Sequence, residues 1–428
     1  MSTPPGTVLI LGADGFIGRH LAFGLRAAGW KVIACARRTA RLERMGFDVL
    51  EADLTDPYWH SLEHWQAPLK HVACVINAAG VLNAPDPVAQ SVHVEAPEAI
   101  YRALPAGASG LLISAVGIDD AQTGFARFRR WGEDIAKARG ITILRAGLVL
   151  GETSYGGSSL ARALAAMPLV TPVVGKGAQP FNPIHAADLA CAVDHMLRTP
   201  PGPGVHEIGG TETVTQAEML RGVRRWLGLG KVPLLRLPVR LARALGRVGD
   251  ALDMGPISAT AVDQLQSGVL ARPGAAVAAL PEPPRGFSQL LAARPAGTQD
   301  LWHARLYLMR PLTRLMLGLL WLVSGLLGLL LSPDSFLPLI PDTAPIPDSV
   351  LTNMARFGGI VDLAIAAALF RGWRPRLMAA IQGLVVTGYT IAFTWLAPGL
   401  WLLPLGGLLK NPALLVLIIL HGILEEER

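Results

Sequence analysis

The chain has 428 residues, of which 51% are hydrophobic and only 16% are charged, and its mean hydropathy is +0.40. This composition excludes a disordered or collagen-like chain and is more apolar than that of an ordinary soluble enzyme. The length predicts two or three domains, one of which carries the hydrophobic excess. The net charge of +6 suits an anionic membrane surface or a phosphorylated ligand, and it is too dilute to indicate nucleic acid as a partner.

The cysteines and the first residues bear on the compartment. Cys35, Cys74 and Cys191 stand far apart in apolar runs, without a CxxC motif or a histidine cluster. We therefore expect no disulfide framework, no metal site and a reduced compartment. The opening residues MSTPPG lack the basic and apolar regions of a secretory signal, so we expect the N-terminal part to stay in the cytoplasm.

Short apolar runs that alternate with helix-like stretches fill the first part of the chain. These runs span residues 8–11, 31–36, 47–51, 71–77, 110–114 and 141–144. Apolar runs without strict alternation, separated by helices, predict an α/β fold with a doubly wound parallel sheet covered on both faces. We assign residues 1–220 to this domain, with cap elements from about residue 151, and residues 221–304 to a small cap region and a loosely structured connection.

The composition changes after Pro311, and residues 305–428 are expected to form an all-α transmembrane domain with about four helices. The expected spans are residues 312–331, 351–370, 377–397 and 400–424, each near the ~20 apolar residues that cross a bilayer. Arginines precede the first span and lie between the second and third, whereas residues 332–350 carry three Asp and no Lys or Arg. This distribution predicts an inner (cytoplasmic) membrane protein with both termini in the cytoplasm.

The most specific motif is Gly12-Ala13-Asp14-Gly15-Phe16-Ile17-Gly18, which lies directly between the first strand and a helical run. A dinucleotide's diphosphate needs a strand-to-helix turn without side chains, so that backbone N–H groups and the helix N-terminus can touch it. We assign the turn to Gly12, the approach of the phosphates to Gly15, and close helix–strand packing to Gly18. An ordinary structural turn is the alternative, and the position between strand and helix favours nucleotide binding.

Two arginines follow the second strand, where a protein that recognises a free ribose 2′-hydroxyl usually has an acidic residue. The guanidinium groups of Arg37 and Arg38 suit a 2′-phosphate, so the sequence predicts NADPH in preference to NADH, with a solvated basic loop as the alternative. Asp53 and Leu54, after the third strand, are placed to flank the adenine. The loop after the fourth strand is placed to bring its backbone to the middle of the cofactor, and it consists of Asn77, Ala78, Ala79 and Gly80.

Together, these motifs resemble those of the short-chain dehydrogenase/reductase superfamily. The series consists of Gly12 to Gly18, Asp53-Leu54, Asn77 to Gly80, Ser114 to Gly117, Ile143 to Gly147 and Asn182 to Asp188. The resemblance implies an NAD(P)-binding Rossmann domain of the extended, atypical branch, which includes an accessory subunit of respiratory complex I. The helical tail resembles the DoxX-like membrane family in helix number and in its Lys410-Asn411 feature, and that family is associated with quinone-linked oxidation.

The catalytic residues of that superfamily are only partly present. The usual Tyr and Lys fall on Phe125 and Arg129, counted back from Glu133, and Phe cannot transfer a proton. Arg129 can hold a ribose or substrate oxygen, Ser114 occupies the position of the superfamily's catalytic serine, and His185 is the best remaining titratable candidate for proton transfer. A strand-end hydroxyl that caps the next turn is the alternative for Ser114, and an ordinary loop histidine is the alternative for His185.

Other charged residues have structural explanations as well as functional ones. We expect Arg145 to pair with a carboxylate and Asp188 to cap the helix that follows it. Arginines at helical spacing in residues 240–247 predict an amphipathic helix that either rests on an anionic leaflet or packs on the globular domain. Asp362, within the second span, should face the helix bundle and either stay protonated or pair, with Arg356, Lys410 and His421 as candidate partners. Polar residues of the third span would complete its lining, namely Gln382, Tyr389 and Thr390. A pair that locks helix packing and a quinone or proton site are the two alternatives for Asp362.

The predicted function is that of a membrane-anchored NADPH-binding oxidoreductase that reduces a lipophilic carbonyl or quinone-type substrate by hydride transfer. The first alternative is a non-catalytic NADPH-binding protein that assists assembly or senses redox state in quinone metabolism or the respiratory chain. The second is isomerisation or epimerisation of a lipid-linked sugar, which also depends on the absent Tyr. The expected partners are the substrate, the lipid bilayer and a membrane protein.

Overall fold

The computed structural model describes residues 6–252, 254–255, 257–341, 345–404 and 407–426. The chain divides into two compact units, which are Met1–Asp250 with Gly255–Ala304 and Ala251–Met254 with Arg305–Arg428. Residues 1–5, on which the expected lack of a secretory signal rests, and Asp342 of the acidic loop lie outside the described residues.

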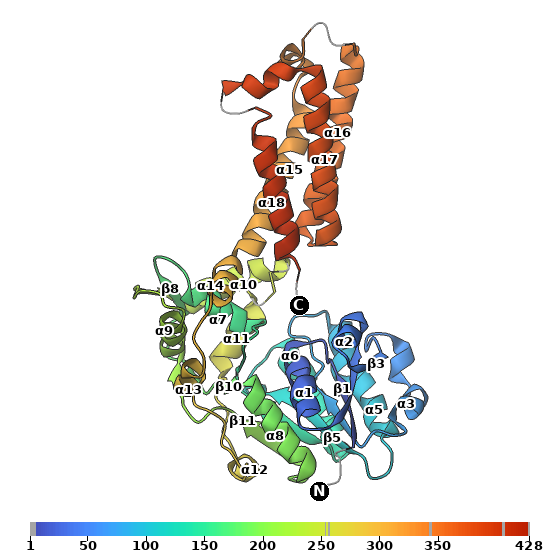
Figure 1. The fold of residues 1–428 in the computed structure, drawn as a ribbon, viewed down its shortest axis with the longest axis vertical. Helices are drawn as coiled ribbons and strands as arrows, with labels where there is room; N and C mark the ends of the chain where they lie inside the picture. The colour runs from blue at the N-terminus through green and yellow to red at the C-terminus, as the bar shows by residue number, and fades with distance from the viewer. Residues whose placement is uncertain (1–5, 253, 256, 342–344, 405–406, 427–428) are drawn as a thin grey trace. The chain divides into compact units, whose positions relative to one another are not determined.

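The first unit is built on a seven-stranded sheet with the order β11-β6-β5-β4-β1-β2-β3, in which all neighbours are parallel (Figure 1). Its strands are β1 (Thr7–Leu11), β2 (Lys31–Ala36), β3 (Asp48–Glu51), β4 (Cys74–Asn77), β5 (Ser109–Ala115), β6 (Thr142–Ala146) and β11 (Gly204–Ile208). The six apolar runs of the sequence form the first six of these strands. The strand β11 was not predicted, because its sequence GVHEI is short and partly polar and it pairs along one edge only.

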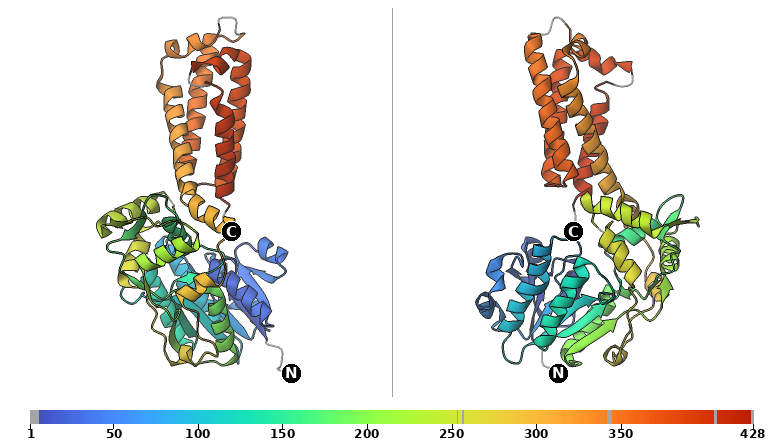
Figure 2. Two further views of the ribbon diagram at one scale, coloured as in Figure 1. Left: turned by 60° about the vertical axis from the view of Figure 1, so that its left-hand side comes forward. Right: turned by 180° about the vertical axis from the view of Figure 1, so that it is seen from behind.

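Helices cover both faces of this sheet, as Figure 2 shows. Alternate residues of a strand point to opposite faces, so Val8 packs in one core and Leu9 in the other. The first core is covered by α1 (Phe16–Ala27) and α8 (Ala186–Arg198). The second is covered by α3 (Leu62–Leu69), α5 (Ala96–Ala103) and α6 (Gly124–Ala138). The predicted doubly wound α/β fold is therefore confirmed.

The strand order reverses between β1 and β4, which lie side by side although β2 and β3 intervene in the chain. In sheets of this kind, ligands bind beyond the carboxyl ends of the strands at such a reversal. The predicted cofactor motifs follow β1, β2, β3 and β4, so the topology brings them to one edge. Short elements complete this half, namely α2 (Ala40–Arg44), η1 (Pro57–His60), α4 (Asp86–Gln90) and η2 (Ser91–Glu95).

The rest of the first unit consists of small sheets and helices that begin after β6. Three two-stranded sheets pair β10 with β7, β12 with β9 and β13 with β8. The strands are β7 (Val149–Leu150), β8 (Thr171–Val174), β9 (Pro180–Phe181), β10 (Ile184–His185), β12 (Val214–Thr215) and β13 (Leu234–Leu237). The helices are α7 (Gly157–Ala165), α9 (Gln216–Trp226), α10 (Val239–Ala251), α11 (Ala259–Ser267), α12 (Ala275–Ala278), α13 (Phe287–Ala292) and α14 (Thr298–Leu306).

The segment 272–285 was predicted as a loose connection, and two of its residues attach it to the rest of the first unit. Val277 of α12 is buried in the core beneath the large sheet. Arg285 forms hydrogen bonds to the Asp188 carboxylate, with a shortest distance of 2.7 Å. One apolar anchor and one ion pair therefore hold a segment whose Pro, Gly and Ala content gave no helical or strand pattern in the sequence.

The second unit is a bundle of apolar helices. Among the described residues, three helices are long and apolar enough to cross a membrane, and these are α15 (Met309–Leu330), within the helical run Thr298–Leu330, α16 (Asp348–Phe370) and α17 (Pro375–Leu396). The fourth, α18 (Lys410–Leu424), has only 15 residues. It is shorter than the predicted span of residues 400–424 because a 3₁₀ turn, η5 (Pro398–Leu402), occupies the start of that stretch. The acidic loop contains η3 (Pro333–Ser335) and η4 (Leu337–Leu339).

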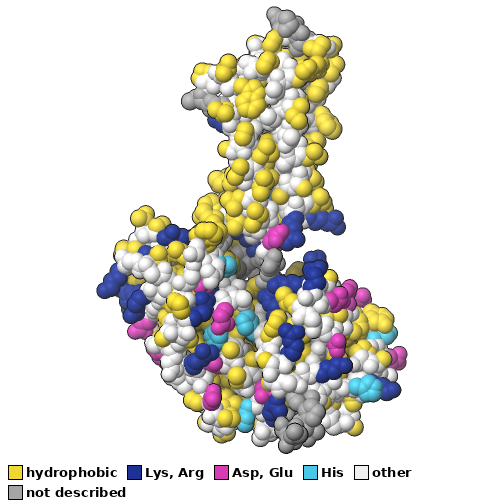
Figure 3. Space-filling model, in the orientation of Figure 1, with side chains coloured by type: hydrophobic (Ala, Val, Ile, Leu, Met, Phe, Trp, Pro, Cys, Tyr) yellow, Lys and Arg dark blue, Asp and Glu magenta, His cyan; other side chains and the backbone are white. Residues whose placement is uncertain are grey.

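Small residues bring the first two membrane helices together. A Cβ on Gly325 would lie 2.8 Å from the carbonyl oxygen of Gly359, and a Cβ on Gly359 would lie 2.8 Å from that of Gly325. Backbones that approach so closely are typical of helix pairs in lipid. Hydrophobic side chains cover the visible outer surface of this bundle (Figure 3). The chain is a membrane protein.

Candidate cofactor and active site

The turn after β1 depends on glycine for two reasons. Gly12 has a φ of +70°, which residues with a Cβ rarely adopt. A Cβ on Gly12 would also lie 2.8 Å from Cα of Ala79, in the loop after β4. The backbone of the turn therefore touches the backbone of the neighbouring strand end, as the sequence motif predicts.

The start of α1 is open to an anion. A Cβ on Gly18 would overlap the carbonyl oxygen of Gly12, so the first turn of the helix packs directly on the turn that precedes it. Gly15 is the N-cap residue and supplies no capping side chain. The N–H groups of the first helical turn therefore have no side-chain partner from the cap and carry the positive end of the helix dipole. This arrangement fits the diphosphate of a dinucleotide.

A buried asparagine shapes the loop after β4. Asn77 is 2% exposed, its Nδ2 donates to the Tyr101 hydroxyl at 3.0 Å, and its Oδ1 accepts the N–H of Ala79 at 3.1 Å. Burial raises the pKa of Tyr101 to about 12, so this phenol stays neutral. The side-chain amide of Asn77 therefore positions Ala79 beside Gly12 and takes no part in the chemistry itself.

Basic side chains gather where the adenosine ribose would lie. Arg37 and Arg38 are exposed after β2. Asp53 is partly buried, which opposes ionisation, but hydrogen bonds from the N–H and hydroxyl of Thr55 and the charge of Arg37 hold its pKa below the usual value. Leu54, beside Asp53, is buried against the second core of the sheet.

Sequence reasoning missed two further arginines in this region. Burial and the positive charge of Arg41 lower the pKa of Arg19, and the carboxylate of Asp14 opposes that shift. Arg19 directly follows the last glycine of the motif, and Arg41 lies in the first turn of α2, four residues after Arg37. The position of Arg19 beside the glycine motif was the available signal.

Ser114 lies at the carboxyl end of β5 and is 4% exposed. Its Oγ has no hydrogen-bond partner among the described residues. Buried hydroxyl groups are nearly always hydrogen-bonded, so an unpartnered one at the ligand edge of a sheet points to a group that the protein alone does not supply. The alternative for Ser114, a hydroxyl that caps the next turn, has no hydrogen bond to support it.

Arg129 and Phe125 stand on α6 at the positions of the usual Lys and Tyr. The Arg129 guanidinium is half-buried, its Nη1 lies 3.3 Å from the Ala79 carbonyl oxygen, and its Nε has no partner among the described residues. A Cβ on Gly80 would lie 2.7 Å from Nη2 of Arg129, so glycine leaves room for the guanidinium. Burial lowers the pKa of Arg129 to about 10, which leaves it positively charged at neutral pH.

A buried histidine next to Arg129 was also missed. His93 lies in the π-helical segment η2 and is 3% exposed, and its Nε2 is 3.1 Å from the carbonyl oxygen of Val81. Burial and the charge of Arg129 lower its pKa to about 3, so His93 is neutral. Its ring packs edge-on against Phe125 with the centroids 6.1 Å apart. A single histidine in a helical stretch carries no motif, so no sequence signal marked it. π-Helical segments occur often at functional sites.

His185 has a structural role that the sequence assigned to Asp188. The side chain of His185 caps α8, because its Nδ1 accepts the N–H of Ala187 at 3.2 Å. The helix therefore begins at Ala186, and the prediction that Asp188 caps it is wrong; Asp188 pairs with Arg285 instead. Nε2 of His185 lies 3.2 Å from Glu152, and burial lowers its pKa. Its role in proton transfer stays a prediction, and these contacts do not favour it.

Arg145 is paired as expected. It is 7% exposed and forms hydrogen bonds to the carboxylates of Glu133 at 2.7 and 2.9 Å and of Asp119 at 2.6 and 2.9 Å. The hydrogen bonds that Arg145 donates to Glu133 raise the pKa of Arg145 further. This cluster stabilises β6 and α6 behind the candidate site.

Part of the cap region lies over the end of β5. Gln264 of α11 donates to the carbonyl oxygen of Val116 at 3.3 Å, and its Oε1 has no partner among the described residues. Asn182 exchanges two hydrogen bonds of 2.9 Å with the backbone of Ala271. A Cβ on Gly117 would overlap the carbonyl oxygen of Gly268. These contacts hold the cap against the loop that follows Ser114.

Asp362 in the membrane bundle is held by neutral donors. The hydroxyl of Ser324 donates to it at 2.6 Å, and that of Tyr389 at 3.2 Å. Tyr389 was predicted as part of a polar lining around Asp362, and its hydrogen bond agrees with that prediction. Arg356, a predicted partner of Asp362, donates instead to the carbonyl oxygens of Gly328 and Leu331. Gln382 binds Trp321 at 2.9 Å, and Thr390 binds Asn411 at 2.8 Å. The polar groups thus lock helices to one another.

Comparison with known proteins supports both halves of this description. Residues 8–96 match the NAD dependent epimerase/dehydratase family, and residues 318–419 match the DoxX-like family, as the sequence predicted for the tail. The ceramide reductase of Caulobacter vibrioides is 30% identical over 260 residues, which cover 54% of this chain and 74% of that protein. The chain is thus an NAD(P)-dependent reductase-like protein with a membrane domain. These matches do not support a quinone as substrate.

Solved structures show the same fold at low identity. The UDP-glucuronic acid 4-epimerase of Bacillus cereus, solved with its substrate and NAD, superposes with a TM-score of 0.51 and 16% identity over 70% of this chain and 99% of that one. The dTDP-4-dehydrorhamnose reductase of Bacillus anthracis, solved with NADP, gives a TM-score of 0.52 and 14% identity over 68% and 98%. At these identities, the likeness shows the fold alone.

Proposed function

This chain belongs to the NAD-dependent epimerase/dehydratase family, and we propose that it is a membrane-anchored, NADPH-dependent reductase of a ketone on a ceramide-like lipid. The observation that carries the proposal is a pair of buried polar atoms at the ligand edge of the sheet, Ser114 Oγ and Arg129 Nε, for which the described part of the chain offers no hydrogen-bond partner. Both positions match catalytic positions of the superfamily that the sequence resembles, and a bound cofactor and substrate would supply the missing partners.

The residues of the chain divide the work of such a reduction. When bound, NADPH would supply the hydride that adds to the carbonyl carbon, and the chain's own residues would position the ketone and stabilise its oxygen. The Ser114 hydroxyl donates a hydrogen bond to the carbonyl oxygen as negative charge develops there, and water supplies the proton that completes the alcohol. The charge of Arg129 holds the ribose hydroxyls and favours the developing oxyanion. The balance is one ketone, one NADPH and one proton to one secondary alcohol and one NADP⁺.

The substrate class follows from the relative and from the membrane unit. Hydride transfer to a ketone leaves a hydroxyl group, so the reducible precursor of a ceramide-like lipid carries a ketone in place of a hydroxyl. A lipid of this kind resides in the bilayer, and helices that cross the membrane keep the reductase at its surface. Arg37 and Arg38 favour the 2′-phosphate of NADPH. The cytoplasmic orientation and a membrane protein partner stay predictions.

One observation favours a second candidate, a binding protein that holds NADPH without turnover. Phe125 stands where a reductase of this superfamily has a proton-donating Tyr, and no hydroxyl replaces it on α6. In that case, the cofactor would stabilise the domain or report the redox state, and a ketone would not be reduced.

An assay on the reconstituted full-length protein distinguishes the two. We expect purified protein in lipid vesicles to retain NADPH, and NADPH absorbance to fall when a ceramide oxidised to the ketone is added. Ser114→Ala should lower kcat about a hundredfold with bound NADPH unchanged, because one oxyanion donor is lost. Ser109→Ala, at the exposed start of the same strand, is the control. Retained NADPH without turnover of this ketone would support the binding protein, and turnover of a short-chain quinone alone would overturn the lipid substrate.

The cofactor preference has its own test in the same vesicles. Arg37→Glu should weaken NADPH binding about ten- to a hundredfold, because charge-assisted hydrogen bonds to a phosphate are lost, and should leave NADH binding nearly unchanged. Titration of both nucleotides by intrinsic fluorescence measures this difference. Equal losses for both nucleotides would contradict the assignment of NADPH.

A further inference from the structure

The helix α10 has two faces of opposite character. Its buried residues are Ala242, Gly246 and Gly249. A Cβ on Gly246 would lie 2.5 Å from the backbone nitrogen of Ala259, and a Cβ on Gly249 would overlap the carbonyl oxygen of Ile257. The small face therefore packs against the start of α11, backbone to backbone, and fixes which side of the helix is left uncovered.

The uncovered side carries an apolar stripe. Leu241, Leu245 and Val248 recur at i, i+4 and i+7, so they lie in line along the helix, and they are 47%, 49% and 53% exposed. Solvated helices place polar residues on this side. Nothing in the described part of the first unit covers the stripe, although exposing apolar side chains to water is energetically unfavourable.

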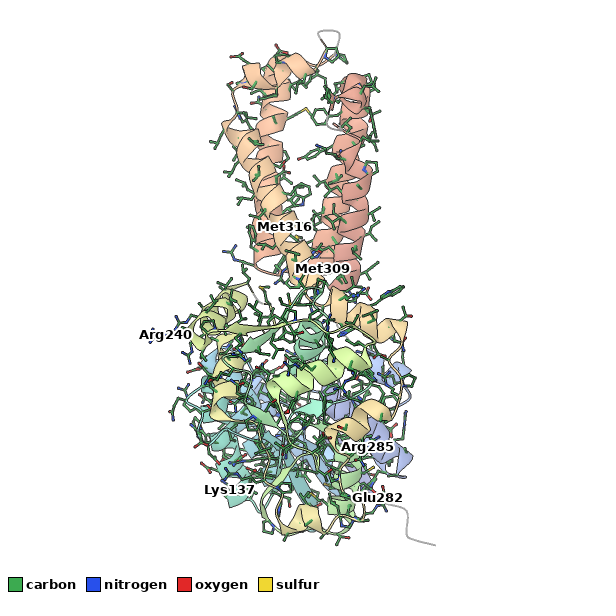
Figure 4. All side chains as sticks on the ribbon, turned by 90° about the vertical axis from the view of Figure 1, so that its left-hand side faces the viewer. Lys137, Arg240, Glu282, Arg285, Met309 and Met316 are labelled. Atoms are coloured by element: carbon green, nitrogen blue, oxygen red, sulfur yellow. The ribbon has the colours of Figure 1, made fainter. Side chains whose placement is uncertain are left out.

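Basic residues border the stripe. Arg240 and Arg247 are exposed, and Figure 4 shows Arg240 projecting from α10 away from the ribbon. No ion pair to either of them is formed within the described ranges. The acidic residues nearby are already committed, since Asp263 pairs with Arg243 at 2.7 Å and Asp250 accepts hydrogen bonds from Asn83 and from the Ala259 N–H. The exposed side therefore combines apolar side chains with uncompensated positive charge.

The helix continues directly into a membrane-associated segment. Its last residue, Ala251, begins the short stretch Ala251–Met254, which belongs to the membrane unit. Within that unit, Arg314 of α15 donates to the carbonyl oxygen of Leu252. Leu252 and Met254 line an apolar cavity of about 270 Å³ with residues 308–315 of the first membrane helix. The chain thus leads from α10 into residues of the membrane unit that contact the start of a membrane-spanning helix.

We propose that α10 is an interfacial helix that inserts its Leu241–Leu245–Val248 stripe into an anionic bilayer surface, with Arg240 and Arg247 on the lipid headgroups. An amphipathic helix of this kind buries its apolar face at the headgroup boundary and gains from each cation near acidic lipid. A second copy of the chain fits the stripe less well, because a two-fold contact would bring the arginines of both copies together. The proposal is independent of whether the first unit turns over a ketone.

Quenching of a fluorescent label on the full-length protein, measured with lipid-bound and aqueous quenchers, tests whether α10 inserts into the bilayer surface. Cys191, the exposed cysteine, is replaced by serine, and Leu245→Cys is labelled with an environment-sensitive NBD dye. Cys35 and Cys74 are buried and stay unlabelled, because burial raises their pKa values to about 12 and about 11. In vesicles with phosphatidylglycerol, we expect a blue-shifted emission that spin-labelled lipid quenches and aqueous iodide does not. Val205→Cys on β11, which is 38% exposed, is the matched control and should show the reverse.

Charge reversal separates the basic residues from the apolar stripe. Arg240→Glu with Arg247→Glu should abolish lipid quenching at residue 245 in phosphatidylglycerol vesicles and leave nucleotide content unchanged, because neither arginine belongs to the cofactor site. Quenching by iodide at residue 245 to the extent seen at residue 205 would overturn the proposal. Protection from both quenchers would also overturn it, since that result indicates a protein over the stripe. Lipid quenching that survives charge reversal would refute the preference for anionic lipid.

Discussion

Two arginines of the first unit lie in contrasting surroundings, the buried Arg145 and the half-buried Arg129. Arg145 donates hydrogen bonds to two carboxylates, those of Asp119 and Glu133, and these hydrogen bonds raise its pKa. In the described ranges, Arg129 has one long hydrogen bond, to a backbone oxygen, and its Nε has no partner; burial lowers its pKa. Both lie near the carboxyl ends of the central strands, yet only one has its charge satisfied by the protein.

The contrast distinguishes an arginine whose charge stabilises the fold from one whose charge is available to a ligand. A buried cation without a carboxylate costs stability, and the fold retains it where a ligand completes its hydrogen bonds. Arg145 therefore belongs to the scaffold, and Arg129 with Ser114 belongs to the site. Substitutions at Arg145, at Arg129 and at the neighbouring His93 should therefore have different effects on stability and on nucleotide binding.

The largest effect is expected at Arg145. Arg145→Met leaves Glu133, which is fully buried, without its main partner and should lower the free energy of unfolding by about 3–5 kcal/mol. The double variant with Glu133→Met should recover most of that loss, because an apolar pair of similar volume replaces the ion pair. Thermal unfolding of the detergent-solubilised protein measures both. A double variant as unstable as the single one would contradict this explanation.

Arg129 should behave in the opposite way. Arg129→Met should weaken NADPH binding at least about tenfold, while the nucleotide-free protein keeps or raises its Tm, because a poorly partnered buried cation is removed. Arg127→Met on the same helix is the control, since Arg127 is exposed and pairs with Asp86 at the surface. If Arg129→Met destabilised the nucleotide-free protein as much as Arg145→Met, the distinction between the two arginines would fail.

The smallest effect concerns His93 and acid. Its pKa is about 3 in the folded protein because of burial and the charge of Arg129, below the ordinary value of 6.5. As the pH falls, His93 therefore takes up a proton in the unfolded chain before it does so in the folded protein. The contribution of neutral His93 to the free energy of unfolding is fully present above pH 6.5 and is lost progressively as the pH drops toward 3. The loss should be about 1 kcal/mol per pH unit, or roughly 2–4 °C in Tm.

A pair of variants isolates this contribution. His93→Gln should flatten the fall of Tm between pH 6.5 and pH 5, whereas His71→Gln, which changes an exposed histidine, should follow the unmodified protein. Parallel curves for His93→Gln and the unmodified protein would show that another group governs acid sensitivity.

The sequence contained most of the sheet and the cofactor motifs because those features are local. The apolar runs of β1, β2, β4, β5 and β6 are mostly buried on both faces of the sheet. The glycines of the first turn are recognisable because only glycine readily adopts the backbone geometry of that turn. Residues whose importance arises from tertiary contact were missed, as with His93 and Gln264, since neither stands in a motif. The sequence did not show that His185 caps α8 in place of Asp188, because Asp188 is bound by Arg285, which lies 97 residues later in the chain.

The short fourth helix has a consequence for the lipid around it. At about 1.5 Å per residue, the 15 residues of α18 rise roughly 22 Å, against a hydrocarbon thickness near 30 Å. Mismatch of this size is relieved when the leaflet thins beside the helix or when Lys410 snorkels toward the headgroups. Acyl chains next to α18 would then be shorter and less ordered than elsewhere around the bundle, which would make this flank the easiest place for a long-chain lipid to leave the bilayer.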